Sequence, residues 1–135
     1  MKAEMMIKIF RNMYGSINIE FDETGNCDIL KMFNELYEGR EYQLRVEFDM
    51  GIIQKKKRGE RENLILICKQ SNEEDSAFRK QDGNIVWVIN QEDIELGIER
   101  FSECKKDGYF FPAEFIQMSI PGNKRSVYVY CRLVY

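Results

Sequence analysis

Residues 85–108 read IVWVINQEDIELGIERFSECKKDG, an apolar run followed directly by a polar segment with helical periodicity. Ile85–Ile89 is apolar on both faces and rich in β-branched residues, a composition typical of a strand near the centre of a sheet. Asn90 is a favoured N-cap residue, acidic residues follow it in the first turn, and Gly108 provides a C-terminal stop. The stretch therefore predicts a central strand and then a helix, with Trp87 of the strand buried against at least one helix.

The segment before this unit contains a second helix preceded by strands. Apolar and polar residues alternate over 5–9 and 16–21, which predicts a hairpin. Apolar residues then recur at helical spacing over Cys27–Glu38, so we expect an amphipathic helix with Asn26 as its cap and Gly39 as its stop.

The remaining apolar segments predict further strands, while the acid-rich residues 71–82 are interpreted as a loop. These strands are expected at residues 42–48, 64–68, 115–120 and 127–134. The order ββαβββαββ indicates an α+β fold with a mainly antiparallel sheet of about seven strands and both helices packed on one face. With no linker in the chain, we expect a single globular domain over residues 1–135, and the residues of the two halves show no internal repeat.

Composition narrows the chemistry that the chain can perform. The sequence has no histidine, which removes Ser-His-Asp triads, Cys-His pairs and histidine metal sites. Its four cysteines form no Cys-x-x-Cys pair, so we interpret them as reduced apolar residues rather than metal ligands. We expect no enzyme activity, no metal and no cofactor, although a carboxylate-based active site stays open as a third hypothesis.

The chain shows no features of export or membrane insertion. It has no apolar run of the roughly 18 residues that span a bilayer. Its N-terminus carries charges inside its short apolar run and lacks a signal-peptide cleavage site. We therefore expect a cytoplasmic protein without a membrane partner.

The predicted helix after Asn90 carries four glutamates on the side opposite its apolar residues. The set that we expect to bind a partner is Glu92, Glu95, Leu96, Glu99 and Glu103. Like-charge pairs at i,i+4 cost a helix about 0.2–0.5 kcal/mol each. The first-turn glutamate recovers some of this cost from the helix dipole, and the later ones recover little. Together with Leu96, which we expect to be exposed beside them, the glutamates suit a basic protein partner. The alternative is an ordinary solvated helix face.

A basic segment precedes the strand at 64–68. It contains Lys55, Lys56, Lys57, Arg58 and Arg61. At the tip of a hairpin these residues would contact nucleic-acid phosphates. The alternative is a solvated loop whose lysines prevent edge pairing.

Two aromatic groups complete the candidate surfaces. Tyr109–Phe111 and the pair Tyr128 and Tyr130 are interpreted as strand residues that pack in the core and across strands. Tyr128 and Tyr130 alternate with apolar residues, so they share one strand face with Arg132, and we expect a second interaction patch there if no helix covers that face.

The sequence thus favours a non-enzymatic protein-binding domain. Its most concrete form is an immunity-type inhibitor, a small acidic protein that neutralises a basic toxin or nuclease by binding it; the net charge of −3 permits this. The alternative is a small nucleic-acid-associated or regulatory domain that uses the basic 55–61 segment. Neither hypothesis predicts an oligomeric state.

Overall fold

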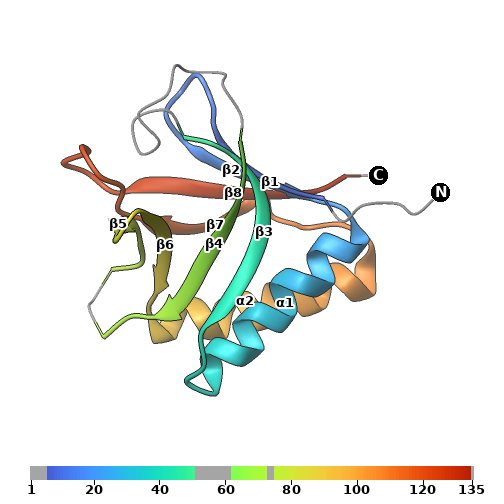
Figure 1. Ribbon diagram of the computed structural model, residues 1–135. Helices are drawn as coiled ribbons and strands as arrows, with labels where there is room; N and C mark the ends of the chain where they lie inside the picture. The colour runs from blue at the N-terminus through green and yellow to red at the C-terminus, as the bar shows by residue number, and fades with distance from the viewer. Residues whose placement is uncertain (1–5, 51–61, 73–74, 135) are drawn as a thin grey trace.

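The computed structural model describes residues 6–50, 62–72 and 75–134 and shows an α+β fold (Figure 1). Two helices of this part of the chain pack against the inner face of an eight-stranded mixed sheet, and helices and sheet share one hydrophobic core. The elements are β1 Ile7–Arg11, β2 Ile17–Phe21, α1 Glu23–Tyr37, β3 Tyr42–Asp49, β4 Glu62–Gln70, β5 Ala77–Gln81, β6 Asn84–Ile89, α2 Gln91–Asp107, β7 Glu114–Met118 and β8 Val127–Leu133.

The sheet curls into a nearly closed barrel. Its strand order is β5-β6-β4-β3-β1-β2-β8-β7. Strands adjacent in sequence form antiparallel hairpins, and the hairpins join through the parallel pairs β1·β3, β2·β8 and β4·β6. The two ends of this order meet at a parallel bridge between Ala77 and Ser119. There the Ser119 amide donates to the Ser76 carbonyl at 2.9 Å, and the Phe78 amide donates to the Ser119 carbonyl at 3.1 Å.

The predicted sheet was wrong in two details. We predicted about seven strands in a mainly antiparallel sheet, whereas the described sheet has eight strands and is mixed. The missing strand is β5, which lies inside the segment interpreted as an acidic loop. Only Ala77 and Phe78 of β5 are apolar, and β5 is placed by pairing with β6 across a tight turn at Asp82 and Gly83, both with positive φ. The parallel pairs connect strands that are far apart in sequence, so no local pattern reports them.

The buried strand and the capped helix predicted over residues 85–108 are confirmed, but β6 is second from one end of the strand order rather than near its centre. Trp87 is 1% exposed on β6, between β5 and β4, and its ring lies 6.1 Å from the Phe33 ring of α1. The Asn90 side chain caps α2 by accepting from the Asp93 amide at 2.7 Å, and Gly108 ends the helix at a φ of 83°.

Helix α1 begins earlier than its predicted cap, Asn26. The N-cap is Asp22, whose carboxylate accepts from the Gly25 amide at 2.7 Å and from the Met6 amide at 3.2 Å. Gly25 is a helix residue rather than a turn residue. The position requires glycine because an added Cβ would lie 2.2 Å from the Met6 carbonyl oxygen. Asn26 is instead buried between the helices, where its side chain donates to the Phe101 carbonyl at 3.2 Å.

The two helices cross closely because one of them lacks a side chain at the contact. The Phe33 ring of α1 lies against Gly97 of α2, where an added Cβ would fall 2.6 Å from ring carbons. Phe33 also stacks on Phe101, with ring centres 5.6 Å apart. Since Asn26 meets Phe101 while Phe33 meets Gly97, the helices run antiparallel.

The two halves of the chain have the same topology, although their residues show no repeat. Each half is a ββαββ unit, from β1 to β4 and from β5 to β8. The parallel pairs also correspond, since β2·β8 places Ile19 beside Cys131, and β4·β6 places Trp87 beside Cys68. The bridge between Ala77 and the segment after β7 is the counterpart of the β1·β3 pair.

Candidate functional site

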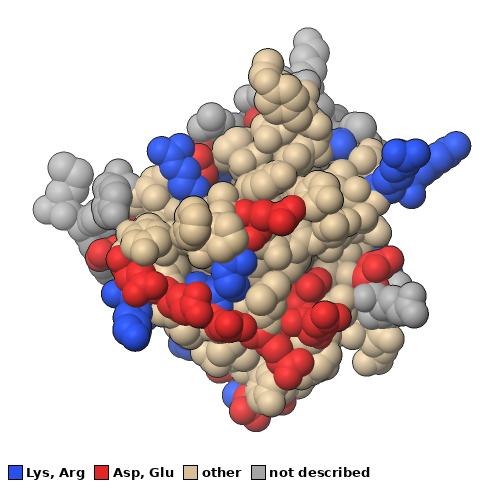
Figure 2. Space-filling model, turned by 180° about the vertical axis from the view of Figure 1, so that it is seen from behind, with Lys and Arg blue, Asp and Glu red and all other residues tan. Residues whose placement is uncertain are grey.

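The glutamates predicted on α2 form an exposed row, here called the acidic row. It consists of Glu92, Glu95, Glu99 and Glu103. Figure 2 shows acidic side chains crossing this face of the molecule in a line. The helix is held by its opposite side, where Ile94 and Phe101 are fully buried. Among the described residues, none of the four glutamates has an ion-pair partner. The row therefore presents uncompensated negative charge on a rigid element.

Leu96 is less accessible than expected. We predicted an exposed side chain beside the glutamates, but Leu96 is partly buried and packs against the core. It lies one turn before Arg100, on the flank of α2 where that arginine reaches the segment before β7. Its contribution to an interface is therefore limited to the part of its side chain that stays at the surface.

Arg100 fixes the segment that follows α2. Its guanidinium donates to the Glu114 carbonyl at 3.1 Å and to the Pro112 carbonyl. The same group lies over the Phe110 ring, 4.4 Å from its centre. Sequence reasoning missed this role of Arg100, because its acceptors are backbone carbonyls that no sequence pattern reveals.

The aromatic residues after α2 are split between core and surface, which corrects the prediction that all three pack inside. Phe110 is buried and its ring contacts those of Phe21, Phe101 and Phe115. Tyr109 and Phe111 point the other way and are 60% and 76% exposed. The split arises in an irregular segment, since residues 108–109 and 111–113 form bends and belong to no strand.

The second predicted patch lies on the outer face of β8. Tyr128 is 44% exposed, and its ring centre is 6.3 Å from that of Tyr130. The Arg132 guanidinium nitrogen lies 3.9 Å from a carboxylate oxygen of Glu20 on β2. The helices pack on the inner face of the sheet, so they do not cover these residues. The three residues share one outward face, as the alternation predicted.

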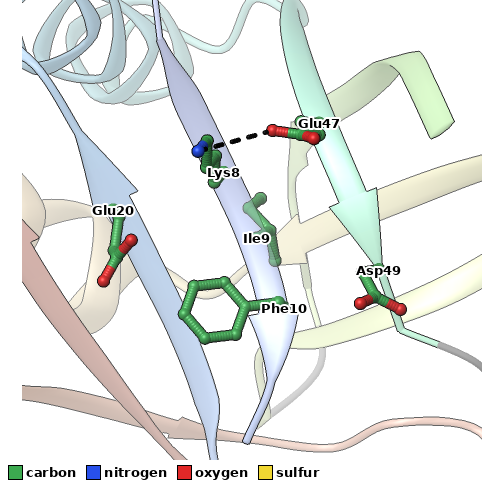
Figure 3. Close-up of a pocket in the computed structure, with 6 residues that line it drawn as sticks. All are labelled: Lys8, Ile9, Phe10, Glu20, Glu47 and Asp49. Atoms are coloured by element: carbon green, nitrogen blue, oxygen red, sulfur yellow. Dashed lines mark ion pairs between the residues drawn. The ribbon is translucent and has the colours of Figure 1, made fainter. Parts of the chain in front are cut away.

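A shallow pocket of about 120 Å³ lies on the outer face of β1, β2 and β3 (Figure 3). Charged side chains line it, and the Lys8 ammonium lies 3.9 Å from a Glu47 carboxylate oxygen. Lys8 also faces Glu20 across the β1·β2 pair, and Glu20 pairs with Arg132 on β8. Charges of alternating sign therefore lie side by side across β3, β1, β2 and β8, and each carboxylate of the pairs lies beside a cation.

The buried thiols are held in their protonated state. Burial raises the pKa of Cys68 and of Cys131 well above the usual value, and it raises the pKa of Cys104 to about 11. Cys27 on α1 is exposed. The interpretation of the cysteines as apolar residues therefore holds for the three buried ones, which lack the thiolate needed for nucleophilic chemistry.

The residues predicted to contact nucleic acid lie outside the described part of the chain, from Lys55 to Arg61. Within the described ranges, no group of three or more histidine, cysteine, aspartate or glutamate side chains is arranged to hold a metal ion. No helix in those ranges is long and apolar enough to cross a membrane.

No protein-family model matches the chain, and no curated protein matches it.

Proposed function

We propose that the chain is a non-enzymatic cytoplasmic protein-binding domain that docks a basic partner on the acidic row. In its most concrete form it is an immunity-type inhibitor that neutralises a basic toxin or nuclease. The observation that carries the proposal is the row itself: four exposed glutamates on one face of α2 with no ion pair among the described residues.

The placement of the row supports this role. The glutamates form like-charge neighbours along α2, which cost helix stability rather than add to it. Helix α2 can carry them because its caps and its buried side hold it in place. Such a rigid charged surface speeds encounter with an oppositely charged protein and discriminates against acidic ones.

The proposal is tested by rescue of growth. An inhibitor gene is expected to adjoin the gene of its target, so the basic protein encoded next to this chain is expressed in a host and its toxicity is measured. Co-expression of this chain should restore growth. The double variant Glu95→Lys/Glu99→Lys should restore it poorly. Lys31→Glu on the exposed face of α1 changes the charge in the opposite direction and away from the row, and it should restore growth at least as well as the unmodified chain.

Binding of the two purified proteins supplies the mechanism of the effect. The double variant should associate more slowly than the unmodified chain, and the difference should shrink at high salt because screening weakens exposed charges. Equal rescue and equal association rates for the double variant would refute the role of the row. Failure of the unmodified chain to bind any basic protein would refute the function.

The alternative of nucleic-acid binding through Lys55–Arg61 is tested with the same protein. Replacing Lys55, Lys56 and Lys57 by serine should leave partner binding intact. A salt-dependent affinity for nucleic acid that this triple variant loses would favour the alternative.

A further inference from the structure

We infer that the partner-binding surface continues from the acidic row onto Tyr109 and Phe111, with Phe111 inserting into an apolar pocket of the same basic protein. The inference rests on the proposed function and adds a hydrophobic anchor to it.

The first argument is exposure within an otherwise anchored segment. Phe111 and Tyr109 flank Phe110, which is buried against three other aromatic rings. The backbone around Phe110 therefore cannot turn its neighbours inward without losing that packing. Tyr109 and Phe111 therefore remain at the surface, 60% and 76% exposed, where they add nothing to the core.

The second argument is that the segment is fixed before any partner arrives. The Arg100 guanidinium donates to the Pro112 and Glu114 carbonyls and lies over the Phe110 ring. An aromatic side chain on a fixed backbone loses little conformational freedom on binding, because it has only two rotatable bonds. Exposed tyrosine and phenylalanine side chains are enriched at protein interfaces relative to the rest of the surface.

The third argument is continuity with the acidic row. Arg100 belongs to the same helix and lies next to Glu99 and one turn before Glu103. Its contacts therefore bring the 110–114 segment against the flank of the row. Figure 2 shows uncharged surface directly beside the line of acidic side chains. The exposed Tyr109 and Phe111 belong to the short link between α2 and β7, which the Arg100 contacts hold against the helix.

These features specify the chemistry of the occupant. The Arg100 guanidinium is engaged by backbone carbonyls and by Phe110 rather than by a glutamate of the row. Within the described residues the four carboxylates therefore stay without an ion pair beside the exposed aromatic pair. A complementary protein has lysine or arginine side chains that meet the row and an apolar pocket adjacent to them. The charges govern the rate of encounter, and the aromatic anchor governs the lifetime of the complex.

Photo-crosslinking in the cells from which the chain comes tests this arrangement and captures the partner in the same step. A benzoylphenylalanine is introduced at Phe111 in one variant, at Ser102 on the exposed face of α2 in a second, and at Tyr14 in the β1–β2 turn as a control. We expect positions 111 and 102 to crosslink the same basic protein and position 14 not to do so. Both crosslinks should decrease when Glu95→Lys/Glu99→Lys is combined with the probe.

The purified crosslinked protein then measures the strength of the anchor. Phe111→Ser should raise its dissociation rate about tenfold or more, with little change in association rate. Tyr14→Ser removes an aromatic side chain that is even more exposed, at 87%, and should change the rate less than about twofold. Circular dichroism should show that both serine variants fold, since neither side chain lies in the core.

The outcomes separate the two proposals. A basic protein that crosslinks at position 102 but not at 111, or that leaves Phe111→Ser no faster than it leaves the unmodified chain, overturns the anchor and preserves the proposed function. The absence of a basic protein at both positions overturns the proposed function and the anchor with it.

Discussion

The two ββαββ halves place their helices in corresponding positions, yet α1 and α2 present different surfaces. The exposed side of α1 carries one acidic and one basic residue, Glu23 and Lys31, among neutral ones. The exposed side of α2 carries the acidic row, and the link that follows α2 carries the exposed aromatic pair. The inner sides agree, because Phe33 and Phe101 lie at the same distance from their N-caps and stack on each other. The two helices thus have corresponding buried residues in the core, and they differ in the residues that they expose.

One inner position breaks this agreement. Ile29 and Gly97 correspond when each helix is counted from its cap, and both are buried. Ile29 fills space in the core, whereas Gly97 leaves space for the Phe33 ring. The halves therefore complement each other at this contact instead of duplicating it, which allows two helices of unlike sequence to cross closely.

The largest expected effect compares the corresponding strand positions Trp87 and Ile19. Both side chains are buried, on the parallel strand pairs β4·β6 and β2·β8 that join the two halves. Trp87→Ala should lower the free energy of unfolding by about 3–5 kcal/mol and Ile19→Ala by about 2–5 kcal/mol. Urea denaturation measures both, and a loss below about 1 kcal/mol at either site would show that the joins are not equivalent in packing.

A smaller effect is expected at the position where the helices differ. Gly97→Ala should destabilise the protein by about 1–3 kcal/mol, because its Cβ meets the Phe33 ring, although alanine ordinarily favours a helix over glycine. Ile29→Ala should also destabilise, by the opposite mechanism of an unfilled cavity.

Adding Phe33→Leu to Gly97→Ala distinguishes the two mechanisms. If the steric contact is the cause, the double variant should lose less stability than the sum of the single variants. Strict additivity would place the cost of Gly97→Ala elsewhere.

The smallest expected effect concerns a titratable group that one half has and the other lacks. Burial raises the pKa of Asp93, nearby Glu92 and Asp75 act in the same direction, and the hydrogen bond from Ser76 opposes them. The corresponding residue of α1 is Gly25, which does not titrate. A carboxyl whose pKa is higher in the folded state binds protons more readily there. Its contribution therefore favours folding below the usual pKa of 3.8 and is lost as the pH rises through the raised value.

Asp93→Asn removes this titration. The unfolding free energy of the unmodified chain, taken relative to that of Asp93→Asn, should increase as the pH falls from neutrality toward 3.8. Denaturation curves at several pH values measure the difference. A difference that decreases on acidification would mean that the hydrogen bond from Ser76 outweighs burial.

Sequence patterns predicted the elements whose signals are local. Helix α2 was predicted because its cap, its periodicity and its glycine stop lie within one continuous stretch, and Trp87 because the run around it is apolar on both faces. Strand β5 was missed since its position depends on β6 rather than on its own two apolar residues. The α1 cap was misplaced because Gly25 resembles a turn residue until the close approach of Met6 is known.

The candidate surfaces were predictable to a similar extent. The acidic row follows from helical spacing and is exposed as expected. The exposure of Phe111 could not be derived, because aromatic residues are most often buried and the Arg100 contacts that fix its backbone involve carbonyl groups.

The closed strand order has a consequence for where such a chain can start. Strands β1 and β8 flank β2, so that Ile7 pairs with Phe21 on one side while the Val134 amide donates to the Phe21 carbonyl at 2.8 Å on the other. The first and last described strands are thus separated by a single strand, and the order of neighbours runs around a ring with no natural origin. A circularly permuted chain that begins at β5 and ends at β4 would form the same neighbours in the same order. In the permuted chain, the connection between β4 and β5 is cut, and a new short link joins the end of β8 to the start of β1 on either side of β2.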